Sequence, residues 1–318
     1  MALNPLTVRK LRRFRSIKRG YWSFLLLAGM MAASLLGELF VSNRALLVRY
    51  DGHWYFPTYG ANLPGATFGF DYTYDTNYRD LQEKCRAENR GNWVLLPPVP
   101  FGPNENTPYQ GVFKPAPPSW LGGPAGHWLG TDTTGRDIFA RLVFGFRIAI
   151  FFALIFMTLT YLVGITIGCL MGYYGGVFDL IVQRVIEIWS NIPFLYMVII
   201  LFSVVPSTFS VFARIGLLLA VMVLFSWTSM TYYMRTATYR EKSRDYASAA
   251  IVLGAGPVRI IFHHILPNTL STIVTFVPFT VVSAITAITA LDFLGFLLPP
   301  PTPSMGELLK QGTQTLTT

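Results

Sequence analysis

Charged residues are scarce in this sequence. Asp, Glu, Lys and Arg make up 13% of its 318 residues, whereas a soluble domain carries roughly 25%. Apolar residue types make up 52%, and the mean hydropathy is +0.44. So few charges could not cover the surface of a soluble protein of this length. Disorder is excluded as well, because disordered chains are poor in aromatic residues, which reach 15% here. The composition therefore predicts an integral membrane protein.

Cysteine is almost absent too, since Cys85 and Cys169 are the two in the sequence. This number excludes a small scaffold that depends on disulfides. Cys169 lies within a long apolar run and Cys85 within a polar segment, so the two are not expected to pair. Cys85 is expected to be a buried thiol.

Motifs for nucleotide, metal and covalent chemistry are missing. The sequence has no G-x-x-x-x-G-K-[ST] loop, no H-E-x-x-H and no Cys/His cluster with metal spacing. His263 and His264 are adjacent, so on a helix they point in different directions, and a structural role is expected. No Ser/His/Asp set can be assembled with the four histidines. The chain is therefore predicted to hold no cofactor and not to be an enzyme.

Long apolar runs are what the sequence does contain. Helices are predicted for them, because lipid offers no water to satisfy backbone groups, and the runs do not alternate as barrel strands do. The first run follows basic residues but is longer than the core of a signal peptide, so a retained helix is expected. Each run is long enough to cross a hydrocarbon core of roughly 30 Å. The five predicted spans are residues 22–41, 148–171, 188–205, 215–234 and 265–291.

The distribution of charge predicts the orientation. Residues 1–21 contain basic residues and no acids, so the positive-inside rule places the N-terminus in the cytoplasm. The segment 43–141 then lies outside and is nearly neutral, whereas the loop 235–262 lies inside and is positive. The net charge of +9 is thus mainly an orientation signal, and nucleic-acid binding is the weaker interpretation. The basic residues of the N-terminal segment are Arg9, Lys10, Arg12, Arg13, Arg15, Lys18 and Arg19.

The outside segment, residues 43–141, is rich in Pro, Gly, Asn and Tyr. Residues 48–56 predict a short hairpin that turns at Asp51-Gly52. Little else in the segment shows a helical period, so a loop-rich insertion is predicted. Its aromatic residues are expected to form a small core rather than a ligand site.

The predicted spans contain almost no ionisable residues. Carriers driven by proton or sodium gradients usually bury such groups for their function. Arg184 and Glu187, at the entry of the third span, are three residues apart and are expected to pair with each other. Energy for any transport must then come from a partner, although a gradient-driven secondary transporter remains the alternative.

The loop between the last two spans predicts a helix, a break and a second helix. Ser243 can cap the first helix, and Asp245 suits its positive end. Tyr246, Ala250 and Leu253 lie on one apolar face. Either Gly254 or Gly256 can provide a left-handed C-cap, and Pro257 suits the first turn of the next helix. This short helix could pack on its own spans or insert into a groove of another subunit.

This loop resembles the coupling loop of ABC-importer permeases, E-A-A-x3-G-x9-I-x-L-P. Ser248 stands where Glu is usual, and His264 stands where Ile is usual. Residues 264–268 read H-I-L-P-N, as is common in the branch that carries oligopeptides. The matching positions are Ala249, Ala250, Gly254, Leu266 and Pro267.

Three further stretches resemble the same branch, and together the resemblance covers nearly the whole chain. Residues 127–137 match H-x-L-G-T-D-x-x-G-R-D, residues 172–176 match G-Y-x-G-G, and residues 291–296 resemble L-x-F-L-G-x. The long outside segment is most similar to that of the permease for microcin C and related oligopeptides.

The resemblance implies an all-α type I transmembrane domain with a loop-rich periplasmic insertion. Its parts are a cytoplasmic N-terminus and first span (1–42), the insertion (43–141) and the permease domain (142–318), with a coupling helix near 243–256. Members of the family normally have six spans, so a sixth helix is expected that this sequence does not contain, and a truncated sequence is the favoured explanation.

The resemblance also implies function and partners. The chain would be a permease subunit in the bacterial inner membrane that imports oligopeptides, including microcin C-like peptides, by alternating access. Its partners would be a second homologous permease, cytoplasmic ATPase subunits that hold ATP and Mg, and a periplasmic peptide-binding protein. The substrate itself, and the residues along the path, stay open. A membrane enzyme and an ABC exporter are disfavoured alternatives.

Two sets of residues follow from the resemblance. The ATPase-docking set is Asp245, Tyr246, Ala249, Ala250, Leu253 and Gly254. The structural set, in which Arg136 is expected to pair with a carboxylate, is Gly130, Asp132, Gly135, Arg136, Asp137 and Pro267.

Small residues and prolines suggest how the spans pack and bend. A glycine recurs every four residues from Gly164 to Gly176, which allows close helix packing, either static or as a moving seam. Pro193 and Pro278 are expected to bend the third and fifth spans.

Overall fold

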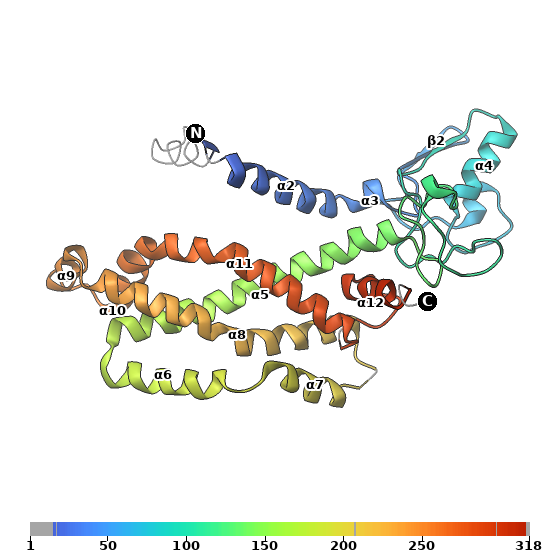
Figure 1. Cartoon of the computed structure of the whole chain (residues 1–318). Helices are drawn as coiled ribbons and strands as arrows, with labels where there is room; N and C mark the ends of the chain where they lie inside the picture. Colours follow the sequence, from blue (N-terminus) through green and yellow to red (C-terminus); the bar gives the residue numbers. More distant parts are fainter. Residues whose placement is uncertain (1–14, 17, 207, 297, 316–318) are drawn as a thin grey trace. The chain divides into compact units, whose positions relative to one another are not determined.

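The computed structural model describes residues 15, 16, 18–206, 208–296 and 298–315 (Figure 1). The basic residues Arg9, Lys10, Arg12 and Arg13 therefore lie outside the described residues. The chain divides into two compact units, one formed by residues 1–147 with 301–318 and the other by residues 148–300. Helix α5 (Ile138–Tyr174) contributes residues to both units.

The first unit combines short helices with a small sheet. Before the sheet come α2 (Lys18–Leu35) and α3 (Gly37–Phe40). The sheet consists of β1 (Leu47–Tyr50), β2 (His53–Tyr55) and β3 (Trp93–Leu95). The unit also contains η1 (Gly65–Phe68), α4 (Tyr78–Glu88), η2 (Ser119–Leu121) and α12 (Met305–Thr315).

The predicted hairpin is confirmed. Strand β1 lies between β2 and β3 and is antiparallel to both, so that Val48 pairs with Tyr55 on one side and Val94 on the other. The two turn residues, Asp51 and Gly52, have φ angles of 47° and 81°. Two positive φ angles define the turn type that matches the twist of a two-residue hairpin.

Helix α4 was not predicted, and the expectation of little helical structure in this segment is wrong here. Asn77 caps the helix, because its side chain accepts a hydrogen bond from the Arg79 N–H at 3.1 Å. Tyr78, Leu81 and Cys85 are buried at spacings of three and four residues, so one face covers the sheet. These three positions are the only apolar ones in the helix with helical spacing, so the sequence gives little indication of it.

The core under the sheet contains aromatic side chains, as the sequence suggests. Phe68 is fully buried and meets Tyr50 and Tyr55 edge-on, with ring centroids 5.4 and 5.3 Å apart. Cys85 lies in the same core and is 3% exposed, which confirms the buried thiol. Burial raises the pKa of this thiol, so it is held in its neutral form.

The second unit is helical. It contains the greater part of α5, then α6 (Gly176–Ser190), α7 (Phe194–Val204) and α8 (Val211–Lys242). The short helices α9 (Asp245–Val252) and α10 (Pro257–Arg259) lead through a π-helical turn, η3 (Ile260–Ile265), into α11 (Leu266–Phe293).

Among the described residues, three helical segments are long and apolar enough to cross a membrane. They are Ile138–Tyr174, Val211–Lys242 and Pro257–Phe293, and they contain the second, fourth and fifth predicted spans. A fourth span results if α6 and α7 are counted together. The first predicted span corresponds to a shorter apolar stretch, Phe24–Leu35, followed by α3.

The third predicted span is not one straight helix. Helix α6 begins at Gly176, well before the predicted start, and ends at Ser190. Pro193 then precedes α7, and the axes of the two helices differ by 67°. The break follows from Pro193, which has no N–H to donate and keeps the preceding residue out of the helical conformation.

A glycine row on α5 allows this helix to approach α8 closely. A Cβ atom on Gly168 would lie 2.5 Å from the Thr231 carbonyl oxygen and 2.8 Å from the Met234 Cβ. A Cβ atom on Gly164 or on Gly172 would likewise lie 2.8 or 2.6 Å from a backbone carbonyl oxygen of α8. Gly176 differs, because it lies past the end of α5 with open space around it. Three of the four glycines in the predicted series thus form the contact.

We expect Gly168→Val to separate α5 from α8. A side chain at this position cannot avoid the facing backbone, and overpacking a tight contact costs roughly 1–3 kcal/mol. The midpoint of thermal unfolding, measured in detergent, should fall. Gly216→Val is the matched control, because a Cβ on Gly216 of α8 meets nothing within 4 Å. Equal midpoints for the two variants would contradict the close contact.

Candidate functional site

The loop singled out in the sequence forms α9, as predicted, but its start differs. Arg244 is the N-cap residue, and no side chain caps the first turn. Ser243, the predicted cap, ends α8 instead, where its hydroxyl donates to the Arg240 carbonyl at 2.9 Å. Asp245 lies in the first turn of α9, where the helix dipole favours an acid.

The end of α9 is a Schellman motif. The Ala255 N–H donates to the Ala250 carbonyl at 3.0 Å, and the Gly254 N–H donates to the Ile251 carbonyl at 2.9 Å. Gly254 has a φ of +79°, so it is the left-handed residue. Gly256 has an ordinary φ of −73° and precedes Pro257, the first residue of α10. Pro267 lies in the first turn of α11, directly after the π-helical turn.

One face of α9 packs on its own unit. Ala247 and Ala250 are buried, and Ala250 belongs to a core with Ile260 and Ile265. Tyr246 is half-buried, and its hydroxyl donates to Glu241 Oε2 at 3.0 Å. Burial and then this hydrogen bond raise the pKa of the Tyr246 phenol.

The opposite face of α9 is exposed. Asp245, Ala249 and Gly254 are exposed, and Val252 and Leu253 are each 86% exposed. Of the predicted apolar face, Tyr246 and Ala250 are therefore packed, whereas Leu253 is exposed. The three differ because the helix ends at Val252, so that Leu253 is the C-cap residue and points away from the packed side.

Glu241 is a part of this site that the sequence analysis missed. It is 3% exposed, and its carboxylate lies 3.0 Å from Arg244 Nε and 3.5 Å from Arg240 Nε, besides accepting from Tyr246. The neighbouring Lys242 Nζ donates to the Tyr173 carbonyl at the end of α5. Glu241 thus ties α9 to the end of α8 through Tyr246, and Lys242 ties the same end of α8 to the end of α5. The spacing from Glu241 to Tyr246 is five residues across a helix break, which no helical period would have revealed.

We expect Gly254→Val to disturb the end of α9 while the protein still reaches the membrane. Space is open around Gly254, so the reason is backbone conformation rather than a clash. A β-branched residue at φ +79° costs roughly 1–2 kcal/mol. Transport that depends on ATP should fall at an unchanged membrane level. Gly256→Val, at φ −73°, is the control and should transport normally. Normal transport by both variants would argue against a role for this turn.

The second predicted set lies in the first unit, in the loop that leads into α5. His127 Nδ1 lies 2.8 Å from Asp137 Oδ2, and His127 Nε2 lies 3.1 Å from the Thr107 hydroxyl. Asp137 Oδ1 accepts from the Ala140 N–H at 2.7 Å and so caps the first turn of α5. Gly130 and Gly135 have φ angles of 79° and 83°, and a Cβ on either would meet a facing carbonyl oxygen within 2.5 Å. The two glycines thus let the loop approach the backbone at Ala116 and Thr107.

Arg136 is paired with two carboxylates. Its Nε donates to Asp132 Oδ2 at 2.7 Å, and its NH2 donates to Glu307 Oε1 at 2.7 Å. Arg141, which is fully buried, pairs with Glu307 and lies 3.6 Å from Asp132. We call Asp132, Arg136, Arg141 and Glu307 the ion-pair cluster. It joins α12 to the start of α5, a contact across about 170 residues of sequence.

Hydrogen bonds determine the charge state of Asp132. Burial alone would raise the pKa of this carboxyl. The backbone N–H groups of Arg136 and Thr134, together with the Thr134 hydroxyl and the Arg136 charge, outweigh burial and lower it. Asp132 is therefore ionised, and the two arginines face two carboxylates.

We expect Glu307→Gln to loosen α12, because Arg136 and Arg141 would each lose a charged partner. Hydrogen bonds to charged groups contribute roughly 1.5–3 kcal/mol, so the midpoint of thermal unfolding should fall. Lys310→Gln removes an exposed charge from the same helix and serves as the control. A midpoint for Glu307→Gln equal to that of the control would show that the cluster contributes nothing to stability.

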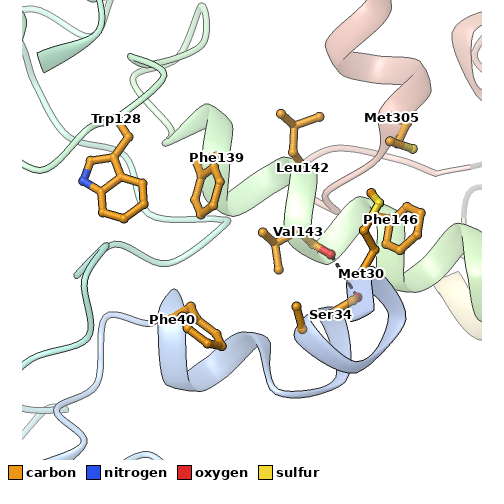
Figure 2. A pocket seen from close by; sticks show the side chains of 10 residues that line it. Met30, Ser34, Phe40, Trp128, Phe139, Leu142, Val143, Phe146 and Met305 are labelled. Atoms are coloured by element: carbon orange, nitrogen blue, oxygen red, sulfur yellow. Dashed lines mark hydrogen bonds between the residues drawn. The ribbon is translucent and has the colours of Figure 1, made fainter. Parts of the chain in front are cut away.

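The first unit also contains an apolar cavity of about 500 Å³ (Figure 2). Met30, Phe40, Phe139 and Met305 are among the side chains around it. The one hydroxyl in its lining, that of Ser34, donates to the Val143 carbonyl at 3.4 Å. The cavity thus suits hydrocarbon and not a polar cargo.

Comparison with known proteins adds to this geometry. Residues 164–317 match the family described as binding-protein-dependent transport system inner membrane component. The chain is 41% identical to the inner membrane ABC transporter permease protein YejE of Escherichia coli, over 99% of this chain and 88% of the relative. It is 36% identical to the peptidoglycan transport system permease protein YejE of Agrobacterium fabrum, over 98% and 85%. It is also 36% identical to the dipeptide transport system permease protein DppC of Haemophilus influenzae, over 69% and 72%.

Apolar helices long enough to span a membrane and this family match define a multi-pass membrane permease. The chain belongs to the family of binding-protein-dependent transport system inner membrane components, and it is the permease subunit of an ABC importer. Its relatives place it in the oligopeptide and dipeptide branch, which confirms the resemblance found in the coupling loop. Members of this family are transport subunits and not enzymes, and a gradient-driven carrier is not favoured.

Proposed function

We propose that this chain forms one half of a path for peptides through the bacterial inner membrane, in an importer driven by ATP. The other parts are a second homologous permease, cytoplasmic ATPase subunits that bind ATP and Mg, and a periplasmic protein that delivers peptide. No cofactor is expected in this chain itself. Relatives named as dipeptide and oligopeptide permeases support a peptide cargo. Among peptides, the resemblance of residues 43–141 to the insertion of the microcin C permease favours modified oligopeptides, and a relative named as a peptidoglycan transport permease makes peptidoglycan fragments a second candidate.

The observation that carries the proposal is the pair of unlike faces on α9. The inner face, with Ala247 and Ala250, is packed, whereas Val252 and Leu253 are exposed although both are large and apolar. Apolar residues exposed at the end of a water-facing helix are typical of a contact with another subunit. We propose that Asp245, Ala249, Leu253 and Gly254 contact an ATPase subunit, and that Tyr246 and Ala250 act from the packed side by holding the helix in place.

Glu241 connects α9 to α8, and Lys242 connects the same end of α8 to α5. A shift of α9 would be passed to α8 through Glu241 and to α5 through the Tyr173 carbonyl. Closure of the ATPase dimer would thereby move these helices as a body, as alternating access requires.

We further propose the topology inferred from charge. The N-terminus is cytoplasmic, residues 1–42 include the first of five spans, residues 43–141 are a periplasmic insertion, and residues 142–318 form the permease domain. The loop that carries α9 lies on the cytoplasmic side, where the ATPase subunits are. Gly130, Asp132, Gly135, Arg136 and Asp137 then order the periplasmic end of α5, and Pro267 starts α11 behind the coupling helix.

The docking proposal is tested by Val252→Asp in the complete transporter. A charge on the exposed face of α9 should prevent binding of the ATPase subunits, so that they no longer co-purify with the tagged permease. ATP-dependent uptake of a labelled oligopeptide should be lost as well. Val112→Asp, the same change at an exposed position in the insertion, is the control and should retain both.

Two results would contradict the proposal. Full co-purification and uptake in Val252→Asp would show that α9 does not contact the ATPase. A wild-type permease that purifies alone and takes up peptide in response to a proton or sodium gradient would favour a secondary transporter.

A further inference from the structure

A second cavity, of about 440 Å³, lies among α5, α8 and α11 of the second unit. Its lining differs from that of the apolar cavity in the first unit, because it contains both aromatic rings and several hydroxyl groups. The lining includes no Asp, Glu, Lys, Arg or His. The hydroxyl groups come from all three helices and include those of Thr160, Ser226, Ser229, Thr280 and Ser283.

Thr160 is unusual among the hydroxyl groups of these helices. Threonine in a helix commonly donates to the carbonyl four residues earlier. Thr158 and Thr166, on the same helix, do so at 2.8 and 2.7 Å. Thr160 is 3% exposed, yet among the described residues its hydroxyl has no hydrogen-bond partner. A buried polar group without a partner is costly, so native structures rarely retain one unless something else binds it.

Two other hydroxyl groups of the lining bind each other, and two of its rings are stacked. The Tyr161 hydroxyl and the Thr280 hydroxyl lie 2.8 Å apart and are hydrogen-bonded to each other. The rings of Tyr233 and Phe276 are stacked, with centroids 3.9 Å apart, and form a flat apolar wall. The cavity therefore combines an unpaired hydroxyl with aromatic surfaces and carries no charge.

We infer that this cavity is a binding site on the transport path for the uncharged amide groups of a peptide backbone, with neighbouring peptide side chains against the rings. The inference rests on the proposed function of peptide import and assigns residues to the path. The Thr160 oxygen is itself buried, so its hydroxyl can donate to a peptide carbonyl or accept from a peptide N–H once the side chains around it shift. An uncharged lining would pass peptides of either charge, so that selection would fall to the binding protein.

The first test measures the number of peptides imported per ATP hydrolysed by the complete transporter, with peptide-loaded binding protein, in lipid vesicles. Thr160→Val keeps the shape and removes the hydroxyl. Losing one hydrogen bond should lower this ratio roughly two- to tenfold. Thr160→Ser restores the hydroxyl and should restore the ratio. Thr158→Val, which removes a hydroxyl that is already paired within the helix and is absent from the cavity lining, is the matched control.

The second test uses Ser229, which is exposed to the cavity and tolerates substitution more easily than a buried position. Ser229→Asp places a negative charge on the path. Import of a basic peptide should then exceed import of an acidic peptide of equal length by severalfold more than in the wild type. A residue with only a structural role would change both peptides alike.

The outcomes distinguish a failure of the proposed function from a failure of the cavity assignment. A wild-type complex without ATP-dependent peptide import would defeat the proposed function itself. A wild type that imports peptides, with an unchanged ratio in Thr160→Val and an unchanged charge preference in Ser229→Asp, would overturn the cavity assignment alone.

Discussion

The cost of an unpaired charge in or near lipid is the constraint on which this structure depends. Charges are few, and two of the arginines on the long helices each form a two-point ion pair with a carboxylate. Asp179 of α6 forms a two-point ion pair with Arg235 of α8, at 2.5 and 2.6 Å. Within the first unit, Arg147 of α5 is bound in the same manner by Glu38, at 2.7 and 2.8 Å. Such pairs connect elements that are distant in sequence and leave the remaining helix surfaces apolar.

The proposed docking of an ATPase subunit on α9 depends on paired charges as well. Helix α9 follows the charged end of α8, where Glu241, Lys242 and Arg244 are held by one another or by neighbouring backbone. Because these contacts connect α9 to α8 and α8 to α5, a displacement of α9 would move the ends of these helices with it. In the proposed complex, an ATPase subunit would contact the exposed apolar residues Val252 and Leu253.

The sequence predicts the local features of this fold well, since each depends on nearby residues. The Asp51-Gly52 hairpin, the Gly254 cap and the start of α10 at Pro257 all follow from backbone preferences. The bend before α7 follows from Pro193, although the early start of α6 was missed because its charged residues interrupt the apolar run. Contacts between residues far apart in the sequence could not be predicted. Nothing near Arg136 or Arg141 indicates Glu307, and the five-residue step from Glu241 to Tyr246 has no helical period.

We propose that this permease moves peptide only when a bound ATPase hydrolyses ATP. The most direct measurement is uptake of a labelled oligopeptide by vesicles containing the purified complex and peptide-loaded binding protein. We expect uptake with ATP and Mg on the ATPase side, none with a non-hydrolysable ATP analogue, and no response to an imposed proton or sodium gradient. Uptake that follows the gradient and ignores ATP would contradict it.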